Sequence, residues 1–382
     1  MLMQAKRSMT VAFTVAAALL GAQPAHAGAG VKWSAAPAVP LRFGVTAAQL
    51  NDVAVLSAND AWAVGEQADG QRHPIAAHWN GTGWTTPNLP VPTGPQGQYG
   101  LSTVDATGPN DVWAAGTDAS TAPVFLHGTA TGWQRVPSSV PAGTVEDLDM
   151  LSPSDGWAVG KTARGTGQPL VLRWQGGSWA SVAAPEIDGS LTAVHAVTAD
   201  DVWAAGSQTE PDGSTSGLLL HWDGTAWTVA GQLPPLPGAG DVAFDDVSAA
   251  AHGDVWVVGA RCTGEDDCTP LALHLGAGGW QVVPSDETAT RLTGVIAFAA
   301  DDVWMTGYVA GTLDAESVHV EHWDGVRFTT DQQAGRDPSS PNDGQGQPAS
   351  GLTAIAGDPV NRDLFAVGWS LEVHVTPYAI RR

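Results

Sequence analysis

Short runs in which apolar and polar residues alternate follow one another along most of the chain. One of them recurs with small changes, as in "NDAWAVGE" at 59–66 and "DDVWAAGS" at 200–207. Its central aromatic residue returns at intervals of 44 to 61 residues, at Trp62, Trp113, Trp157, Trp203, Trp256, Trp304 and Phe365. Runs of this length, rich in Val and Trp and bounded by Asp, Asn and Gly, predict β-strands. Copies of one strand at a steady spacing predict a repeat protein.

Each repeat contains four such runs. In the fourth repeat they are "LTAVHAV" (191–197), "DVWAAG" (201–206), "LLLHWDG" (218–224) and "WTVAG" (227–231). Four antiparallel strands in about 50 residues describe one blade of a β-propeller. A solenoid of helix pairs is excluded, because no repeat contains ten residues of helical periodicity. The sequence therefore predicts an all-β fold, a seven-bladed β-propeller.

The seventh repeat lacks its fourth strand. It contains "GLTAIAG" (351–357), "DLFAVGWS" (363–370) and "EVHVTPY" (372–378), and no run that opens with Trp follows. Such a run stands at the other end, where "VKWSAAPAVP" (31–40) matches "WTTPNLPVP" from Trp84. We expect the N-terminal strand to complete the last blade, which would close the ring and remove its free sheet edges.

The recurring aromatic residues on the second strand are expected to pack between neighbouring blades, because each buried Trp removes roughly 150–250 Å² from water. The Asp before each of them is expected to bond its own downstream backbone at the hairpin turn. Polar residues recur on the third strand, at His78, His127, Arg173, His221, His274, His322 and His374. Equivalent residues of adjacent blades are too far apart to share a zinc ion, whose ligand atoms lie at about 2 Å. Packing or turn capping is therefore expected of these histidines.

The repeat "DVWAVG…HWDGTxW" resembles that of secreted bacterial propeller proteins, a group placed loosely beside the kelch and galactose-oxidase propellers. The likeness covers essentially all of the chain after its N-terminal segment. It implies the fold and export, and no particular activity. The turn "WDGTAW" (222–227) also resembles the Asp-box of sialidases, without its full pattern. A galactose-oxidase copper site is not expected, because only Tyr99, Tyr308 and Tyr378 are present and both cysteines have another use.

The N-terminus has the features of a secretory signal peptide, predicted at residues 1–27. Two basic residues precede an apolar run (9–20), and Ala25-His26-Ala27 offers an A-x-A cleavage site. A membrane anchor is disfavoured, since about 20 apolar residues are needed to span a bilayer. We expect residues 28–382 to form one propeller domain that is secreted and extracellular.

The net charge of the chain limits the classes of partner that we expect. The chain has 16 basic and 39 acidic residues, a net charge of −23, which repels phosphate backbones and anionic lipid. Nucleic acid and membrane are therefore not expected as partners, and we expect the protein to be a monomer.

Cys262 and Cys268, the only two cysteines, predict a local disulfide in an oxidising compartment. A metal site of both thiolates with Glu265, Asp266 and Asp267 is the alternative, and no clustered His supports it.

Loop lengths favour one face of the ring as the binding face. The turns between first and second strands and between third and fourth strands are short and uniform. The other connections vary widely, for example at 207–217, 261–270 and 331–350, and all of them emerge on one face. Functional residues favour loops on a rigid scaffold. We call this the variable-loop face.

The innermost strands begin on that face and line the channel. Carboxylates near their starts form the candidate ligand site at the channel mouth, namely Asp52, Glu146, Asp147, Asp245 and Asp246. Oxygen ligands of this kind bind Ca²⁺, hold sugars, or supply the carboxylate pair of glycoside hydrolysis. A solvated acidic funnel without a ligand is the remaining alternative. No other cofactor or metal is expected.

The leading hypothesis is a secreted, non-catalytic binding or scaffold propeller that engages an extracellular polysaccharide or protein. A polysaccharide-active glycoside hydrolase or lyase using Asp147 and Asp246 is the first alternative, and a purely structural extracellular protein is the second. No catalytic residue is assigned, because the chain has no P-loop, GxSxG or HExxH motif. Exposed aromatic residues beside the channel would favour sugar binding, and a close carboxylate pair in a deep cleft would favour the enzyme.

Overall fold

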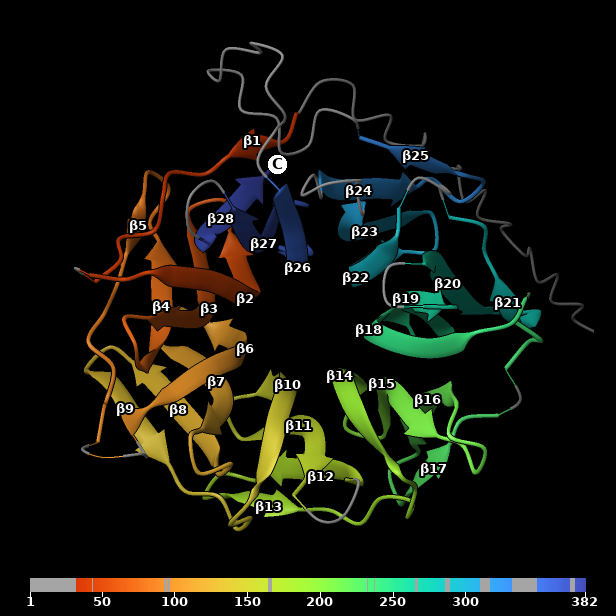
Figure 1. Ribbon diagram of the computed structural model, residues 1–382, viewed down its shortest axis with the longest axis horizontal. Helices are drawn as coiled ribbons and strands as arrows, with labels where there is room; N and C mark the ends of the chain where they lie inside the picture. Colours follow the sequence, from red (N-terminus) through yellow and green to blue (C-terminus); the bar gives the residue numbers. More distant parts are fainter. Residues whose placement is uncertain are drawn as a thin grey trace, which may run out of the picture. The chain divides into compact units, whose positions relative to one another are not determined.

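The computed structural model describes residues 32–382, except 43, 93, 95–96, 164–166, 232, 237, 265–266, 286–288, 310–316, 332–348 and 372–374. The signal peptide predicted at 1–27 lies outside the described residues and stays a prediction. Within Lys32–Arg382, seven sheets of four antiparallel strands stand around a central channel (Figure 1). The seven-bladed β-propeller predicted from the repeats is confirmed. None of the described segments forms a helix of the length and hydropathy that a membrane crossing requires.

Each blade runs outward from the channel in chain order. The innermost strands are β2 (Ala47–Ser57), β6 (Tyr99–Gly108), β10 (Gly143–Ser152), β14 (Gly189–Thr198), β18 (Asp241–Ala251), β22 (Arg291–Ala299) and β26 (Ala349–Gly357). The second strands are β3 (Asp60–Ala68), β7 (Asp111–Asp118), β11 (Asp155–Thr162), β15 (Asp201–Thr209), β19 (Asp254–Cys262), β23 (Asp302–Val309) and β27 (Leu364–Leu371). We number the blades 1 to 7 in this order.

The outer half of each blade is shorter. The third strands are β4 (Arg72–Trp79), β8 (Pro123–Thr129), β12 (Pro169–Trp174), β16 (Thr215–Trp222), β20 (Cys268–Gly276), β24 (Ser317–Trp323) and β28 (Val375–Arg381). The outermost strands are β5 (Trp84–Thr85), β9 (Gly132–Val136), β13 (Trp179–Ser181), β17 (Trp227–Val229), β21 (Gly279–Val282), β25 (Phe328–Thr330) and, in blade 7, β1 (Ser34–Ala35).

The N-terminal strand closes the ring, as predicted. Ser34 pairs with Arg381 and Ala35 with Ile380, so β1 is the outer strand of blade 7 (Figure 1). The neighbouring Trp33 is 5% exposed and packs edge-on against Trp304 of blade 6, with the ring centroids 6.0 Å apart. Closure thus combines a short pair of strands with one buried aromatic anchor.

The third strand of blade 7 differs from its expected register. Arg381, and not a histidine, pairs with Phe365 across the two strands. The expectation that His374 occupies this recurring position was therefore wrong, because β28 begins only at Val375. His374 itself lies outside the described residues.

One aromatic contact repeats at every seam between blades. The second-strand aromatic of each blade packs on an aromatic residue at the start of the next blade's outermost strand, as expected for wedges between blades. The centroid distances are 5.4 Å for Trp62–Trp133, 5.8 Å for Trp113–Trp179, 5.3 Å for Trp157–Trp227, 5.8 Å for Trp203–Trp280, 6.2 Å for Trp256–Phe328, 6.0 Å for Trp304–Trp33 and 6.0 Å for Phe365–Trp84. This sevenfold contact holds the ring together at its outside.

The third-strand histidines complete a column with the tryptophan and the aspartate of the second strand. In blade 2, the His127 ring stacks on Trp113 with centroids 4.2 Å apart, and its Nε2 lies 2.6 Å from Asp111 Oδ1. The same His–Asp bond recurs in blades 1, 4, 5 and 6. These histidines are packing residues, as expected. The role expected for the aspartates was wrong, because in blades 1 to 6 they bond the histidine or arginine of the third strand, and in blade 7 Asp363 accepts the N–H of Ala58 in blade 1.

Candidate functional site

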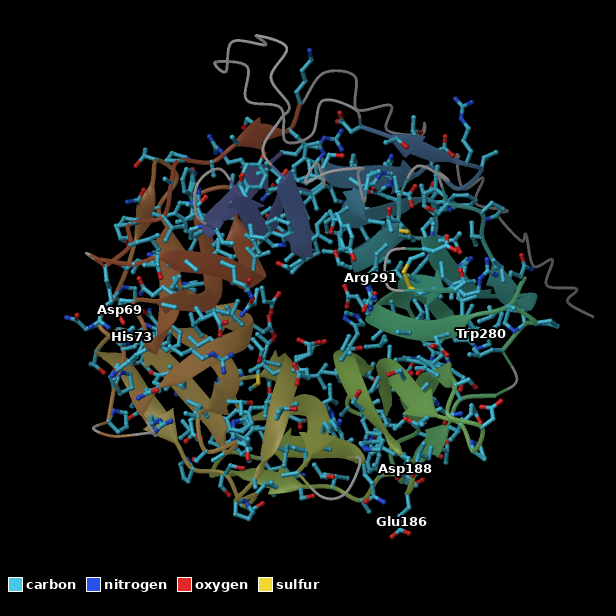
Figure 2. All side chains as sticks on the ribbon, viewed as in Figure 1. Asp69, His73, Glu186, Asp188, Trp280 and Arg291 are labelled. Atoms are coloured by element: carbon cyan, nitrogen blue, oxygen red, sulfur yellow. A yellow bond between two sulfur atoms is a disulfide. The ribbon has the colours of Figure 1, made fainter. Side chains whose placement is uncertain are left out.

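Every innermost strand carries a β-bulge at the same place, just inside the variable-loop face. The extra residues are Asn51, Ser102, Glu146, Thr192, Asp245, Thr293 and Thr353. All seven line the channel, and we call them the bulge ring. A bulge redirects the side chain of its extra residue, which explains why these polar groups converge. In Figure 2, Arg291 lies beside the open channel, whereas Glu186 and Asp188 lie at the outer edge.

Five members of the bulge ring fasten one blade to the next. Each donates a hydrogen bond to a backbone carbonyl of the following innermost strand. The bonds are Asn51–Leu101 (2.7 Å), Ser102–Val145 (2.6 Å), Thr192–Phe244 (2.8 Å), Thr293–Leu352 (2.7 Å) and Thr353–Leu50 (2.9 Å). These side chains are engaged in the architecture, so they are poor candidates for ligand contacts.

The two acidic members of the bulge ring behave differently. Asp245 forms a two-point ion pair with Arg291 of blade 6, with Nε–Oδ2 at 2.7 Å and NH2–Oδ1 at 2.5 Å. Glu146 is exposed, and no hydrogen bond or ion pair between described residues involves its carboxylate. Of the five predicted site residues, Glu146 is the one that the structure leaves available to a ligand.

The aspartate that follows the bulge is a clamp between blades. Asp52 accepts the N–H of Val53 at 2.7 Å and that of Val104, in the next blade, at 2.8 Å. Asp147 does the same with Leu148 and Val194, and Asp246 with Val247 and Val295, at 2.7–2.8 Å. Each carboxylate accepts one N–H of its own blade and the equivalent N–H of the next blade. Three aspartates, in blades 1, 3 and 5, therefore bond this N–H in six blades. We call Asp52, Asp147 and Asp246 the clamp aspartates.

A second polar layer, not predicted from the sequence, lies two residues further along the innermost strands β6 and β10. Asp105 accepts the N–H of Ala106 at 2.7 Å and that of Met150 at 2.8 Å. Asp149 accepts the N–H of Ala196 at 2.8 Å, and its Oδ2 lies 3.3 Å from His195 Nδ1. The signal that could have found this layer was strand alternation, which places residues two apart on one face of the sheet.

Burial in the channel wall raises the pKa of these carboxyl groups. It raises the pKa of Asp52 and Asp149 to about 6, that of Asp105 to about 7 and that of Asp246 to about 8. For Asp147, burial and then the charge of Asp52 place the pKa well above its ordinary value. Desolvation disfavours the ionised form, and the backbone N–H groups offset only part of that effect.

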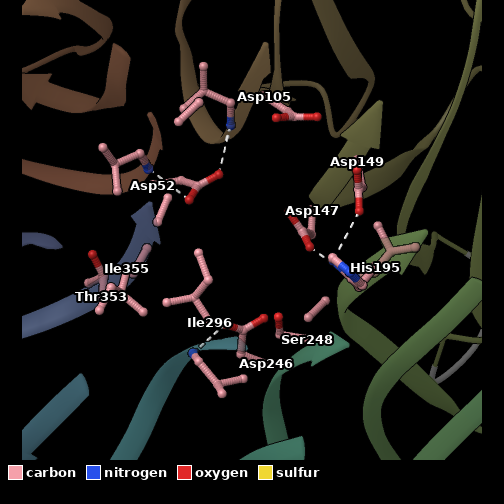
Figure 3. A pocket seen from close by; sticks show the side chains of 18 of the residues that line it. Asp52, Asp105, Asp147, Asp149, His195, Asp246, Ser248, Ile296, Thr353 and Ile355 are labelled. Atoms are coloured by element: carbon pink, nitrogen blue, oxygen red, sulfur yellow. Dashed lines mark hydrogen bonds and ion pairs between the residues drawn. The ribbon is translucent and has the colours of Figure 1, made fainter. Parts of the chain in front are cut away.

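The channel cavity has a volume of about 320 Å³ and two unlike walls. Blades 1, 2, 3 and 5 contribute the aspartates, while blades 6 and 7 contribute mostly apolar side chains. Figure 3 shows Ile296 and Ile355 across the cavity from Asp147 and Asp149. A ligand in this cavity would meet carboxylates on one side and an apolar surface on the other.

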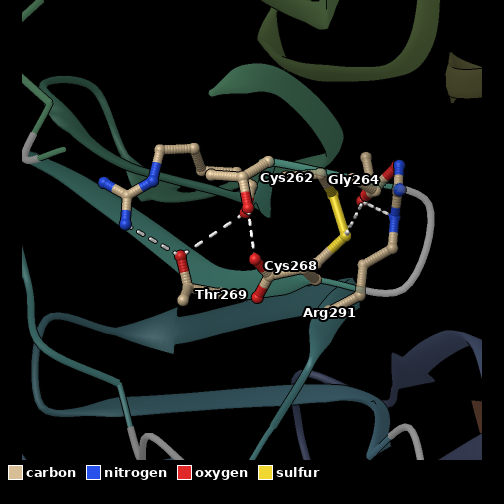
Figure 4. Close-up of a disulfide and its surroundings, with 9 residues drawn as sticks. Cys262, Gly264, Cys268, Thr269 and Arg291 are labelled. Carbon is tan, nitrogen blue, oxygen red and sulfur yellow. Dashed lines mark hydrogen bonds and ion pairs between the residues drawn. A yellow bond between two sulfur atoms is a disulfide. The ribbon is translucent and has the colours of Figure 1, made fainter. Parts of the chain in front are cut away.

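The disulfide predicted between Cys262 and Cys268 is present, with the two sulfurs 2.00 Å apart. The cysteines pair across β19 and β20 at the base of a variable loop. Figure 4 places Arg291 beside this disulfide, so the bridge and the Asp245–Arg291 ion pair lie together. Arg291 was not predicted as a site residue, because no local sequence feature indicates a partner 46 residues away.

Two features bear on the ligand. Among the described residues, the large apolar side chains that are exposed are Val91, Val229, Val326 and Val360, and none is aromatic. Described rings such as those of Trp280, Trp323 and Trp369 are half-buried, and no described Trp, Tyr or Phe lines the channel cavity. The described part of the chain also contains no group of three His, Cys, Asp or Glu residues placed to hold a metal ion. The Ca²⁺ site stays an untested expectation.

Fold and channel define the class of the protein, a seven-bladed β-propeller with a polar central cavity. No protein-family model matches the chain, and neither does any curated protein. A solved protein of unknown function from Dyadobacter fermentans is similar, with 11% identity and a TM-score of 0.50 over 92% of this chain and 98% of that one. At this identity the likeness concerns the fold alone.

Two further solved structures share weaker similarity. A sialidase from Trypanosoma rangeli is 11% identical with a TM-score of 0.49, over 92% of this chain. The present chain spans only 58% of the sialidase chain. A lectin from Burkholderia pseudomallei is 13% identical with a TM-score of 0.49, over 87% of this chain and 98% of the lectin.

Proposed function

We propose that this protein is a non-catalytic binding propeller that works outside the cell as a monomer and holds carbohydrate at the channel mouth on its variable-loop face. The observation that carries the proposal is the state of Glu146. In a ring of seven equivalent side chains, five are engaged by carbonyl groups and one by Arg291, while Glu146 is exposed and lines the cavity. A carboxylate is a strong acceptor for sugar hydroxyl groups.

Binding is favoured over hydrolysis by the hydrogen bonds of the other acids. Glycoside hydrolysis needs two carboxyl groups that can move protons or attack the substrate. Both oxygens of Asp147, and both oxygens of Asp246, already accept backbone N–H groups. Protonation of, or attack by, the Oδ2 atom of either residue would weaken the bond that joins two blades.

The cavity supports recognition by hydrogen bonds and an apolar wall. Glu146 would accept hydrogen bonds from the hydroxyl groups of a sugar. Ile296 and Ile355 would offer an aliphatic surface to the C–H groups of its ring. The Cys262–Cys268 disulfide supports an extracellular location, because disulfides persist in oxidising compartments. The proposal does not depend on the net charge of the chain, since a negative surface keeps a protein soluble whatever it binds.

The test is a glycan-array screen of residues 28–382 with and without Ca²⁺, followed by titration of the best glycan. We expect Glu146→Gln to weaken binding by about tenfold or more, the effect of one lost charge-assisted hydrogen bond. Glu186→Gln removes an exposed carboxylate at the outer edge of the ring and should leave affinity unchanged (Figure 2). Absence of binding to every glycan, or equal affinity of the two variants, would contradict the proposal. A Ca²⁺-induced thermal shift lost in Glu146→Gln would add a cation to the site.

A further inference from the structure

Thr103 joins two clamp aspartates in a way that no other described residue of the channel does. It occupies in blade 2 the position that Asp52 and Asp147 have in blades 1 and 3. Its side chain is buried, with the residue 1% exposed. Its Oγ1 lies 3.0 Å from Asp52 Oδ2 and 2.8 Å from Asp147 Oδ1, and it accepts the N–H of Leu148 at 3.1 Å. Three blades therefore meet at one hydroxyl group.

The number of protons at this meeting point decides its chemistry. A threonine hydroxyl has one proton to donate. The Leu148 N–H supplies the hydroxyl oxygen with a donor, so it does not help either carboxylate contact. Thr103 can therefore donate to Asp52 or to Asp147, but not to both. With both acids ionised, the remaining contact would set two oxygen lone pairs against each other within 3.0 Å.

We propose that the Asp52–Thr103–Asp147 bridge holds one carboxylic acid proton at neutral pH, and that losing this proton loosens the seams joining blades 1, 2 and 3. The proton makes a continuous chain in which one acid donates to Thr103 and Thr103 donates to the other acid. Each oxygen contact then has one donor and one acceptor. The proposal concerns the stability of the ring and does not depend on the identity of the ligand.

The surroundings supply no charge that would replace the proton. The ionisable groups lining the cavity are Asp105 on β6, Glu146 and Asp149 on β10, His195 on β14, and Asp245 and Asp246 on β18. His195 contacts Asp149, and Arg291 at the start of β22 is engaged by Asp245. The described lining residues of β22 and β26 are uncharged. Burial also raises the pKa of Asp52 to about 6 and that of Asp147 well above its ordinary value.

The sign of the pH dependence follows from linkage. The folded bridge keeps a proton that the unfolded chain releases above about pH 4, the ordinary pKa of an aspartate. The stabilising effect is therefore complete below pH 4 and declines as the pH rises, until the pH passes the pKa of the folded bridge. Within that window one proton makes the unfolding constant rise about tenfold per pH unit.

The first test compares urea unfolding between pH 5 and 8 for the wild type, Asp147→Asn and Glu186→Gln. The side-chain amide introduced by Asp147→Asn carries its own N–H donor toward Thr103, so this variant needs no bound proton. It loses the bond from the Leu148 N–H at every pH, so the slope and not the absolute stability is the readout. We expect the pH dependence of its unfolding constant to be flatter than that of the wild type by about tenfold per pH unit. Glu186→Gln should keep the wild-type slope. Equal slopes in all three proteins would overturn the proposal.

The second test begins with the wild type, whose spectrum can contradict the proposal without any variant. Infrared spectra at pH 7 should contain the carbonyl band of a protonated carboxylic acid, and this band should weaken in Asp147→Asn or, if that variant does not fold, in Asp52→Asn. A wild-type spectrum without the band at pH 7 would show that the bridge is fully ionised, and the proposal would be wrong. A band unchanged in the variant would assign the proton elsewhere and would overturn it as well.

Discussion

At the scale of single residues, Arg173 shows what the third-strand position requires. In blade 3 it replaces the histidine that stacks on tryptophan in five other blades. Its guanidinium lies 4.7 Å from the Trp157 centroid, and its Nε and NH2 each bond Asp155 at 2.9 Å. Imidazole and guanidinium share a flat shape and N–H donors at the edge. The position therefore selects a planar donor and not a particular residue.

Substitutions at Arg173 should separate shape from charge. We expect Arg173→His to change the free energy of unfolding by less than about 1 kcal/mol, because histidine makes the same two contacts in other blades. Arg173→Ala should cost about 2–3 kcal/mol through loss of stacking and of the bonds to Asp155. Arg173→Lys keeps the positive charge but has no planar group, so its free energy of unfolding should resemble that of the alanine variant. Urea denaturation measures all three, and a lysine variant as stable as the wild type would contradict the requirement for planarity.

Sequence identified the acids near the start of the innermost strands but not their roles, and it did not identify Asp105 and Asp149 further along the channel. Asp52, Glu146 and Asp147 all line the cavity, as their place at the start of an innermost strand indicated. The partners of the two aspartates are backbone groups of the next blade, 52 residues from Asp52 and 47 from Asp147. Nothing local distinguishes an aspartate whose oxygens are engaged from a glutamate whose oxygens are free. That distinction required the spatial register of adjacent blades.

At the scale of elements, the N-terminal strand has an importance out of proportion to its length. Ser34 and Ala35 pair with β28, and the N–H of Ala36 bonds the carbonyl of Ala379, and this short contact completes blade 7. Trp33 adds a buried contact with Trp304 and belongs to the apolar cluster between blades 6 and 7. Because the strand itself is so short, closure also relies on buried side chains of the N-terminal segment, Trp33 in this cluster and Val39 in the cluster between blades 7 and 1.

Trp33→Ala should therefore destabilise the whole ring. Truncation of a buried tryptophan to alanine costs about 3–5 kcal/mol, and here it would also free the edge of β28. Lys32→Ala, next to it and exposed, is the matched control and should leave stability unchanged. Thermal unfolding followed by tryptophan fluorescence measures both variants. If Trp33→Ala unfolded at the wild-type temperature, closure would rest on the backbone pairing instead.

Strand order was predictable from the repeat, whereas the register of the last strand was not. In blades 1 to 6, short turns that contain Gly, with Asp or Asn as well in blades 1, 4 and 6, follow the third strand and fix its end. Blade 7 has no such turn, because its outer strand comes from the other end of the chain. A strand without a defined turn has a weakly specified register in sequence. The alignment accordingly centred on His374, while the structure pairs Arg381 with Phe365.

At the scale of the whole molecule, an odd number of blades leaves one blade without a clamp aspartate, because each of the three clamps serves a pair of blades. The aspartates of blades 1, 3 and 5 accept the equivalent N–H groups of blades 1 to 6. Blade 7 has Ala354 at the clamp position and blade 6 has Gly294, so no described carboxylate bonds the N–H of Ile355. On the channel side, blade 7 keeps the single hydroxyl bonds of Thr293 and Thr353 to its neighbours.

Blade 7 should therefore open before the rest of the ring. Native-state hydrogen exchange is expected to show β26 and β27 exchanging with an opening free energy about 1–3 kcal/mol below that of β10 and β11, the size of one or two missing hydrogen bonds. Ala354 is half-buried and lines the cavity, so a larger side chain has room there. Ala354→Asn supplies an acceptor for the Ile355 N–H without adding charge and should slow exchange in β26, whereas Ala354→Val, of similar bulk but without an acceptor, should not. Uniform protection of all blades, or the same effect from both substitutions, would mean that the clamps do not determine where the ring opens.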